Sequence, residues 1–431
     1  MKTRALALLG GDPVRNKDYP PHSTIIDDAE KEEVIEVLEG GQLSGFSGRA
    51  GGRFLGGEKV RKFEELFRQR FGTRFAVTFN SATSALHSAV SAAGIGPGDE
   101  VITSPYTMSA TASCILFQNA VPVFADIDPE TFCIDPKSVE ERITPRTRVI
   151  LEVNLFGHPA EFDELIMIAQ RQNLVLIEDN AQSPGALYKG KLAGTIGDMG
   201  IFSLNYHKSI QTGEGGVIVT NNEEMANHLR LIRNHGEAVL DDLGNNDEVN
   251  MLGWNYRMTE LGAAVGIPQL RKLDFFNERR QKLAEVLTGA LEEYDFLTVP
   301  TVRPNCTHVY YMYAMKFDET RIGIDRKTFA RALSAEGIPV DEGYQKPLYL
   351  MPMYRKRMAY GRNGCPFTCR YYPGGIKYKK GLCPVAERMY EKEVITTNIC
   401  RYPNTEEDVL DFARAVGKIV QNIDKLRTYT E

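Results

Sequence analysis

The sequence predicts an α/β protein, with a mainly parallel central sheet in a large domain and a smaller α+β domain toward the carboxyl end. Three observations lead to this fold class. Short apolar segments recur through the middle of the chain, helix-length segments separate them, and 431 residues are enough for two or three domains. Strands that alternate with helices need right-handed crossover connections, which cover a parallel sheet on both faces.

The amino-terminal part predicts an arm over residues 1–24 and then two helices. Residues 27–41 have acidic residues in their first turn, apolar residues on one face and a glycine stop, as expected of a helix. A glycine-dense loop follows at 41–60 and leads into a second helix at 58–72. Loops of this composition cover active sites about as often as they simply connect elements.

The middle of the chain predicts the parallel sheet. Its apolar segments lie at residues 75–80, 100–105, 121–128, 148–157, 173–180 and 217–220. Helices are expected between strands at 84–94 and 162–172. Ligands of open α/β sheets bind at the carboxyl ends of the strands, so side chains that follow these segments are candidates for a site.

The last part of the chain predicts more helix. Helices are expected at residues 223–236, 259–294, 325–337 and 405–424, and a strand is expected within 307–318. Pro268 should kink or break the longest of these helices, because proline lacks the N–H that a helix interior uses. We therefore expect a large domain over 25–275 and a small domain over 276–431.

Charge and hydropathy exclude several classes of partner. A formal net charge of −6 gives the chain no general attraction to nucleic acid or to anionic lipid. Gly10, Gly11 and Pro13 interrupt the first apolar run, and no run approaches the roughly 18 apolar residues of a membrane-spanning helix. These features predict a cytoplasmic enzyme with neither a nucleic-acid partner nor a membrane partner.

The seven cysteines do not form the pattern of a disulfide framework, because their number is odd and they are scattered along the chain. Cys365, Cys369 and Cys383 are the one cluster. A zinc or iron–sulfur site would need a fourth ligand, and none is evident. The cluster therefore favours reduced structural cysteines, and the sequence predicts no metal site.

Lys208 is the first candidate catalytic residue. It lies in FSLNYHKSIQTGEGG (202–216), between a strand-like run and a glycine-rich turn that re-enters a strand. A lysine chosen at random is a solvated surface charge. A lysine held in this context, with Ser203 five residues upstream, instead suggests an amine that forms a Schiff base with an aldehyde cofactor.

Three further features agree with pyridoxal 5′-phosphate (PLP) as that cofactor. Asp179 ends an apolar strand, so its carboxylate can keep a pyridine nitrogen protonated, although a helix cap or an ion pair would use the same residue. At 80–90 a strand leads into a helix whose first residues, Ala82 and Thr83, can hold a phosphate, although an ordinary N-cap also explains the pattern. Ser203 offers a further phosphate donor.

Five motifs give the chain a specific resemblance to a known family. They are AVPVFADIDPETFCID (120–135), EDNAQ (178–182), FSLNYHK (202–208), TGEGG (212–216) and GWNYRMTELGAA (253–264). Over roughly residues 25–425 the chain resembles the DegT/DnrJ/StrS family of sugar aminotransferases. The resemblance implies a fold-type I PLP enzyme, usually a homodimer, that aminates a nucleotide-linked keto sugar or a keto-cyclitol with nitrogen from glutamate or glutamine.

The resemblance also implies roles for individual residues. Lys208 would be the Schiff-base residue and proton shuttle, Asp179 would contact the pyridine nitrogen, and Gln182 would lie near the ring hydroxyl. The implied phosphate-binding residues are Ala82, Thr83 and Ser203. Asn255 would reach the phosphate of the neighbouring subunit, which places the active site at a dimer interface, whereas Arg257 is equally compatible with an ordinary salt bridge.

The chain departs from the family pattern at four places: Met108 affects the stack on the cofactor ring, and the other three predict an altered sugar pocket rather than altered cofactor chemistry. Met108 stands where an aromatic residue usually stacks on the cofactor ring, and a thioether can also pack on a π face. Asn205 replaces a frequent histidine, as in the cyclitol branch of the family, and both residues are expected to contact the cofactor. His158 replaces a common glutamine, and residues 360–383 resemble an insertion near the substrate loops.

Two alternatives to amino transfer through a PLP/PMP cycle remain. A sugar dehydrase of the same family uses pyridoxamine phosphate (PMP) and has histidine in place of the lysine. Here His207 precedes a retained Lys208, which favours the aminotransferase. A sugar-binding homologue without turnover would not need Lys208, Asp179 and Gln182 together.

Overall fold

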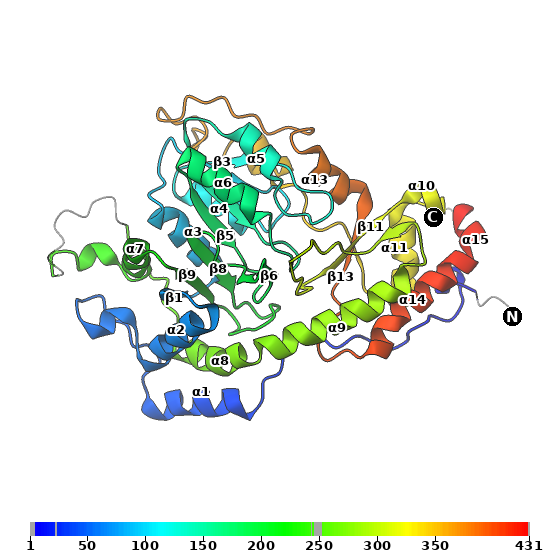
Figure 1. Cartoon of the computed structure of the whole chain (residues 1–431), viewed down its shortest axis with the longest axis horizontal. Coiled ribbons are helices and arrows are strands. Elements are labelled where there is room, and N and C mark those ends of the chain that lie inside the picture. Colours follow the sequence, from blue (N-terminus) through cyan, green and yellow to red (C-terminus); the bar gives the residue numbers. More distant parts are fainter. Residues whose placement is uncertain (1–4, 22–23, 243, 245–251, 430–431) are drawn as a thin grey trace.

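The computed structural model describes residues 5–21, 24–242, 244 and 252–429, and a seven-stranded sheet forms the centre of its larger half (Figure 1). In sheet order the strands are β1 (Phe75–Phe79), β9 (Gly216–Thr220), β8 (Met199–Ser203), β5 (Val175–Asp179), β4 (Thr147–Val153), β2 (Glu100–Thr103) and β3 (Val121–Phe124). Strand β9 is antiparallel to both of its neighbours, and the other adjacent pairs are parallel. The predicted α/β fold with a mainly parallel sheet is confirmed.

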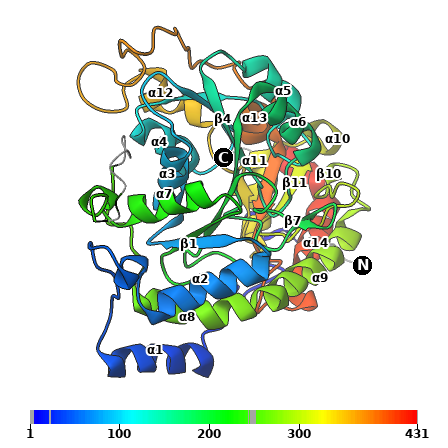
Figure 2. The same ribbon diagram turned by 60° about the vertical axis from the view of Figure 1, so that its left-hand side comes forward.

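Helices cover both faces of this sheet, as the two views in Figures 1 and 2 show. One face packs against α3 (Ala82–Ala92), α4 (Ala110–Phe117) and α7 (Glu223–Arg233). The other packs against α2 (Glu58–Phe71), α5 (Pro136–Arg142), α6 (Phe162–Gln172) and α8 (Glu260–Arg271), and α1 (Asp28–Gly40) lies outside α8. Alternate residues of β9 reach both cores, since Ile218 joins the first and Val217 and Val219 join the second.

The smaller half contains a four-stranded antiparallel sheet, with the order β10 (Leu297–Thr298), β11 (Tyr313–Phe317), β13 (Val394–Thr397) and β12 (Asp341–Glu342). Its helices are α9 (Leu273–Leu291), α10 (Glu319–Ile322), α11 (Arg326–Ala335), α14 (Glu406–Gln421) and α15 (Ile423–Arg427). Other short elements include β6 (Leu187–Tyr188), β7 (Lys191–Leu192), α12 (Pro352–Arg355) and α13 (Pro384–Arg388). One apolar core joins α9, α11 and α14 to the sheet.

The helix expected over 259–294 is interrupted, but not at its proline. Pro268 is buried inside α8, and the break comes after Arg271. The predicted domain boundary after residue 275 falls within α9. The division of the chain into an arm and two domains stays a prediction.

The arm lies against the smaller half of the molecule rather than against the central sheet (Figure 1). Leu6 is fully buried in the core of that half. The backbone N–H groups of Ala7 and Val14 donate to the two carboxylate oxygens of Glu336, at 2.8 and 2.9 Å. These contacts fix the arm before the chain enters α1.

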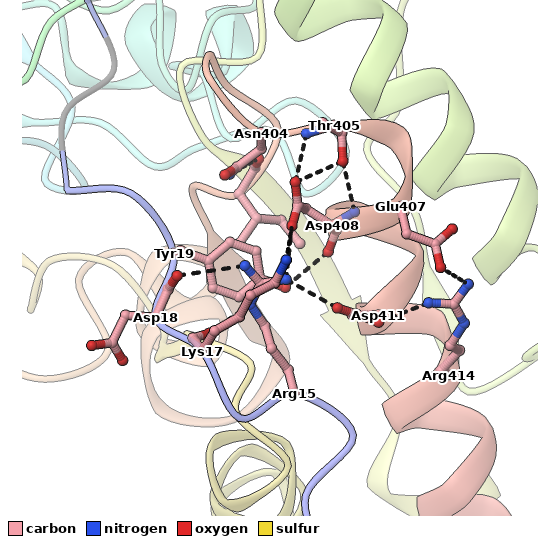
Figure 3. A network of polar contacts seen from close by, with 11 residues as sticks. Arg15, Lys17, Asp18, Tyr19, Asn404, Thr405, Glu407, Asp408, Asp411 and Arg414 are labelled. Carbon is pink, nitrogen blue, oxygen red and sulfur yellow. Dashed lines mark hydrogen bonds and ion pairs between the residues drawn. The ribbon is translucent and has the colours of Figure 1, made fainter.

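A second set of contacts that holds the arm is the polar network around Arg15, shown in Figure 3. The Arg15 guanidinium pairs with Asp408 at 2.8 Å and with Asp411 at 3.0 Å, both on α14. It also lies 3.9 Å from the centre of the Tyr19 ring. Because Arg15 is almost completely buried, these contacts hold residues 15–19 in one place on the surface of α14.

The glycine-dense loop at 41–60 is tied to its neighbours. Glu260 accepts from the backbone of Gly57 at 3.1 Å and of Lys59 at 2.8 Å. Asn234 donates to the carbonyl oxygens of Ser47 and Phe54 at 2.9 and 3.0 Å. The loop is therefore packed on the ends of α7 and α8.

The segment 360–383 does not lie near the substrate loops, contrary to expectation. The Tyr372 hydroxyl donates to Glu100 at 2.6 Å, and the Tyr378 hydroxyl donates to the carbonyl of Pro122 at 2.6 Å. Both acceptors lie at the amino ends of β2 and β3. The segment thus covers the β3 edge of the sheet, from the amino ends of β2 and β3 to the carboxyl end of β3, where Cys383 lies beside the carbonyl of Phe124.

Within the described ranges, no helix is both long and apolar enough to cross a membrane. The same part of the chain contains no group of three His, Cys, Asp or Glu side chains that could hold a metal ion. Cys383 is fully buried, whereas Cys365 and Cys369 are partly exposed in the segment that covers the sheet edge.

Candidate active site

A cavity of about 180 Å³ lies where β4, β5 and β8 end and α3 begins. Of the nine residues predicted for the site, all but Asn255 line it. These are Ala82, Thr83, Met108, Asp179, Gln182, Ser203, Asn205 and Lys208. The parallel sheet therefore brings together segments that are far apart in the sequence, at the end of the sheet where ligands are expected.

Lys208 lies in the turn that follows β8, and its backbone N–H donates to the carbonyl of Asn205 at 2.9 Å. Its Nζ lies 4.5 Å from the centre of the Tyr311 ring and forms no hydrogen bond within the described part of the chain. Burial lowers the pKa of Lys208 to about 8, against the opposing charge of Asp179. The amine is consequently a usable nucleophile and base near neutral pH.

Asp179 is the last residue of β5, and its carboxylate is buried. One oxygen accepts from the Thr111 hydroxyl at 2.9 Å and the other from the backbone of Ala181 at 3.2 Å. Burial raises the pKa of Asp179, and these two hydrogen bonds oppose that rise. A positively charged partner inside the cavity would compensate the buried carboxylate.

Gln182 is held at both ends of its amide. Its oxygen accepts from the backbone of Phe156 at 2.8 Å, and its nitrogen donates to the Tyr344 hydroxyl at 3.0 Å. Tyr344 follows β12, so this hydrogen bond joins the smaller half of the molecule to the site.

The amino end of α3 faces the cavity with free donors. Ser81 caps the helix by accepting from the backbone of Ser84 at 3.1 Å. The N–H groups of Ala82 and Thr83 have no hydrogen-bond partner among the residues that the structure describes. Gly216 leaves them room, since a Cβ there would lie 2.7 Å from the Ala82 nitrogen. The helix end is thus a binding place for an anion such as a phosphate.

Ser203 and Asn205 complete this side of the cavity. The Ser203 hydroxyl accepts from the backbone of Asn205 at 3.4 Å. The Asn205 amide nitrogen donates to both carboxylate oxygens of Glu214, at 2.8 and 2.9 Å, while its amide oxygen is buried without a partner in the described structure. A hydrogen-bond donor on a ligand would satisfy that oxygen.

Three residues that the sequence pointed to lie at the mouth of the cavity or outside it. Met108 lines the cavity, but its side chain is 54% exposed, so it lies at the mouth. Asn255 is exposed outside the cavity, where its amide oxygen accepts from the Arg257 guanidinium at 2.8 Å. His158 does not line the cavity. It is buried and accepts from the backbone of Arg303 at 3.1 Å.

Sequence reasoning missed several lining residues. They are Thr107, His207, Tyr311 and Tyr344, and Thr111 behind them binds Asp179. The tyrosine-rich strand segment at 307–318 was the one available signal for Tyr311. Tyr344 has no local motif, because its partner Gln182 is 162 positions away in the sequence.

These side chains fit PLP. An unbonded lysine amine suits its aldehyde, a buried carboxylate suits a protonated ring nitrogen, and a helix end with two free N–H groups suits its phosphate. Substituting Gly216 by any other residue would crowd that helix end.

Comparison with known proteins finds one family. Residues 25–395 match the family model of the DegT/DnrJ/EryC1/StrS aminotransferase family. A putative L-glutamine:3-amino-2,3-dideoxy-scyllo-inosose aminotransferase of Streptoalloteichus tenebrarius is 35% identical over 99% of this chain and 100% of its own.

Solved structures of an aminotransferase and of a dehydratase have a fold similar to that of this chain. An aminotransferase from Psychrobacter cryohalolentis is 26% identical with a TM-score of 0.81, over 95% of this chain and 100% of that one. A GDP-4-keto-6-deoxy-D-mannose-3-dehydratase from E. coli is 26% identical with a TM-score of 0.77, over 93% and 100%.

Proposed function

Because the chain belongs to the DegT/DnrJ/EryC1/StrS aminotransferase family and is a PLP-dependent aminotransferase, we propose that it moves an amino group from glutamate or glutamine to a keto-cyclitol or a nucleotide-linked keto sugar. The observation that carries this proposal is the unbonded Lys208 amine in the same cavity as the buried Asp179 carboxylate. Donor and acceptor would use this cavity in turn.

Each residue has a proposed task. Bound in the cavity, PLP supplies an electron sink for the negative charge that forms on a carbon when it loses its proton. Lys208 Nζ takes the proton from Cα of the donor and later returns one to the acceptor carbon. The Asp179 carboxylate holds the ring nitrogen in its protonated form, and Ala82, Thr83 and Ser203 orient the phosphate end.

The proposed acceptor class is based on the relative from S. tenebrarius. The name of that protein includes an inosose, which is a keto-cyclitol. The Asn205 amide supports it, because Glu214 fixes the nitrogen and leaves the oxygen to accept a hydrogen bond. A polyhydroxylated ring has many hydroxyl donors. Keto sugars carry such donors too, so the ranking of keto-cyclitols before nucleotide-linked keto sugars rests on the relative that matches nearly the whole chain.

A mass-spectrometric screen tests this proposal. The holoenzyme is incubated with glutamate or glutamine and, separately, with an inosose and a panel of keto-sugar nucleotides. We expect one acceptor to gain an amino group, and the Lys208→Ala variant to yield none. If no acceptor in either class is aminated, the proposed substrate classes are wrong.

A second candidate function is PMP-dependent removal of a sugar hydroxyl, favoured by the likeness to the E. coli dehydratase and by His207 in the cavity lining. The two side chains differ in burial, since His207 is exposed and Lys208 is partly buried, whereas the pKa of each is lowered. Dehydration would show as a product lighter by one water and without donor nitrogen. We expect His207→Ala to keep amination and Lys208→Ala to lose it.

The proposal includes a homodimer in the cytoplasm. Asn255 is exposed outside its own cavity, and we propose that it serves the phosphate of the partner's site. Mixed dimers of Lys208→Ala and Asn255→Ala test this role, because one site in each mixed dimer then has both native residues. Regained activity on mixing supports sharing, and activity that stays at the level of the separate variants contradicts it.

A further inference from the structure

The chain between α12 and α13 concentrates positive charge on one part of the surface. Residues 355–380 contain eight lysine and arginine residues and no aspartate or glutamate, in a protein whose formal net charge is −6. All eight are exposed, and we call the surface that they form the basic rim. They are Arg355, Lys356, Arg357, Arg362, Arg370, Lys377, Lys379 and Lys380. The basic rim is a local exception to the net negative charge, which by itself predicts no attraction to anionic lipid.

Acidic side chains neutralise little of this charge. Lys380 pairs with Glu391 at 2.6 Å, and among the residues that the structure describes the other seven basic side chains form no ion pair. Exposed basic residues on the helices behave differently, as Arg68 does when it pairs with Glu65 on α2. The basic rim therefore keeps charge available for a partner outside the chain.

Buried aromatic side chains hold the basic rim in a fixed shape. Tyr354 and Phe367 each lie edge-on to the ring of Tyr378, with ring centres 5.7 Å apart, and all three side chains are buried. Tyr378 comes between the exposed Lys377 and Lys379 in the sequence. Because anchors and charges are adjacent along the chain, the charges are presented from a folded surface rather than from an unstructured tail.

Three large side chains with apolar surface are exposed among these charges. Met358 is 45% exposed, Tyr360 is 43% exposed and Tyr371 is 55% exposed. A lipid interface accepts this combination, because lysine and arginine bind lipid phosphates while tyrosine and apolar side chains enter the headgroup region.

A nucleic acid would suit these side chains less well. Proteins that bind single strands without sequence preference stack bases on free aromatic faces along a groove. The Arg370 guanidinium already lies over the Tyr371 ring, 4.7 Å from its centre, and the Tyr360 hydroxyl is bound to Asn119. Met358 offers no aromatic face. The observations thus favour a lipid surface.

The basic rim is also placed to meet a flat surface. In both views the loops between α12 and α13 stand at the top of the molecule, and α1 lies at the bottom (Figures 1 and 2). Helix α1 contains six acidic residues and one lysine. A negative surface above the rim would therefore attract it while the acidic helix stays farthest away. The cavity around Lys208 is lined by no residue of the rim, so such binding leaves it free.

We propose that the basic rim binds an anionic lipid surface and holds the enzyme peripherally at the cytoplasmic face of a membrane. Ammonium and guanidinium groups contact lipid phosphates, and Met358 and Tyr371 enter the interface. Each basic residue close to such a surface raises the binding constant about fivefold, so several together give stable but reversible attachment.

Co-sedimentation of the holoenzyme with vesicles tests this inference. One set of vesicles contains equal parts of phosphatidylcholine and phosphatidylglycerol, and the other contains phosphatidylcholine alone. The first rim variant is Arg355→Gln/Lys356→Gln/Arg357→Gln, and a second is Lys377→Gln/Lys379→Gln. A matched control, Arg49→Gln/Lys191→Gln/Arg271→Gln, removes three exposed charges from other parts of the surface. Cofactor absorbance and thermal denaturation check that each variant is folded.

We expect the wild type to bind the anionic vesicles at least tenfold more tightly than the neutral ones. The first rim variant should lose about a hundredfold in affinity and the second about thirtyfold, whereas the control should match the wild type. Loss in either folded rim variant with an unchanged control supports the inference. If the wild type shows no preference for anionic vesicles, or both rim variants bind as the control does, the inference is overturned.

The same proteins are then titrated with polyuridylate and with poly-L-glutamate, and fluorescence anisotropy reports binding. Attachment of either polymer through the rim without binding to anionic vesicles would replace the lipid by a nucleic acid or an acidic protein, and the lipid assignment would fall. These measurements need neither amino donor nor acceptor. Their outcome is therefore independent of whether a keto-cyclitol or a keto sugar is aminated.

Discussion

The two walls of the cavity are built differently. The wall from the larger half consists of strand ends and one helix end, and its key side chains are already fixed, as Asp179 is by Thr111. The wall from the smaller half consists of Tyr311 and Tyr344, which come from loops beside β11 and β12. The first wall supplies the ionisable groups for the chemistry, Lys208 and Asp179. The second supplies aromatic surface and two hydroxyl groups that can distinguish substrates.

The sharpest test of this contrast is Lys208→Ala, which removes the base from the first wall. We expect amination to fall by about a thousandfold or more, because general-base catalysis and covalent attachment are lost together. Steady-state assays with mass-spectrometric product detection measure the loss. Unchanged turnover in this variant would remove the basis of the proposed mechanism.

Asp179→Asn comes next, since it removes the charge and keeps the shape. We expect kcat to fall by about a hundredfold and PLP to bind more weakly, because a neutral amide no longer favours a protonated ring nitrogen. Thr111→Val is the matched control, which removes only one hydrogen bond to the carboxylate and should cost about tenfold or less. Equal losses in the two variants would argue against a role for the charge.

The lowered pKa of Lys208, about 8, predicts a pH dependence of moderate size. The free amine is the reactive form, and its share rises from about a tenth at pH 7 to about nine tenths at pH 9. We expect the rate at which apoenzyme captures PLP to rise about tenfold over that interval and then level off. A rate that keeps rising above pH 10 would indicate an ordinary, solvated lysine.

Tyr344→Phe probes the second wall and should have the smallest effect. The change removes the hydroxyl that accepts a hydrogen bond from the Gln182 amide. That hydrogen bond is worth about 1 kcal/mol, so kcat/KM should fall about fivefold. Separate KM values for donor and acceptor show which substrate the hydroxyl serves. A loss as large as that of Lys208→Ala would mean that the two walls are not different in kind.

Most of the first wall could be predicted from the sequence, because its main residues follow a recognisable strand or begin a recognisable helix, although Thr107 and His207 were missed. Lys208 and Asp179 lie within short motifs, and their strands are plain apolar runs. The second wall could not. Its contacts join residues more than a hundred positions apart, and the hydroxyl of Tyr344 meets Gln182 only after both halves have folded.

Two sequence interpretations went wrong for related reasons. His158 and residues 360–383 differ from the family pattern, and a difference in pattern was taken as a difference in the pocket. In the structure His158 packs against the backbone of Arg303, and the segment covers a sheet edge.

The position of the arm has a consequence for the order of folding. Leu6, Ala7 and Val14 are synthesised more than three hundred residues before Glu336 and its partner Lys418. During synthesis the Leu6 side chain therefore stays exposed to solvent, and the arm can dock only when α14 is complete. Closure of this contact is therefore a late event, and a nascent chain halted before α14 should leave its first residues open to proteolysis.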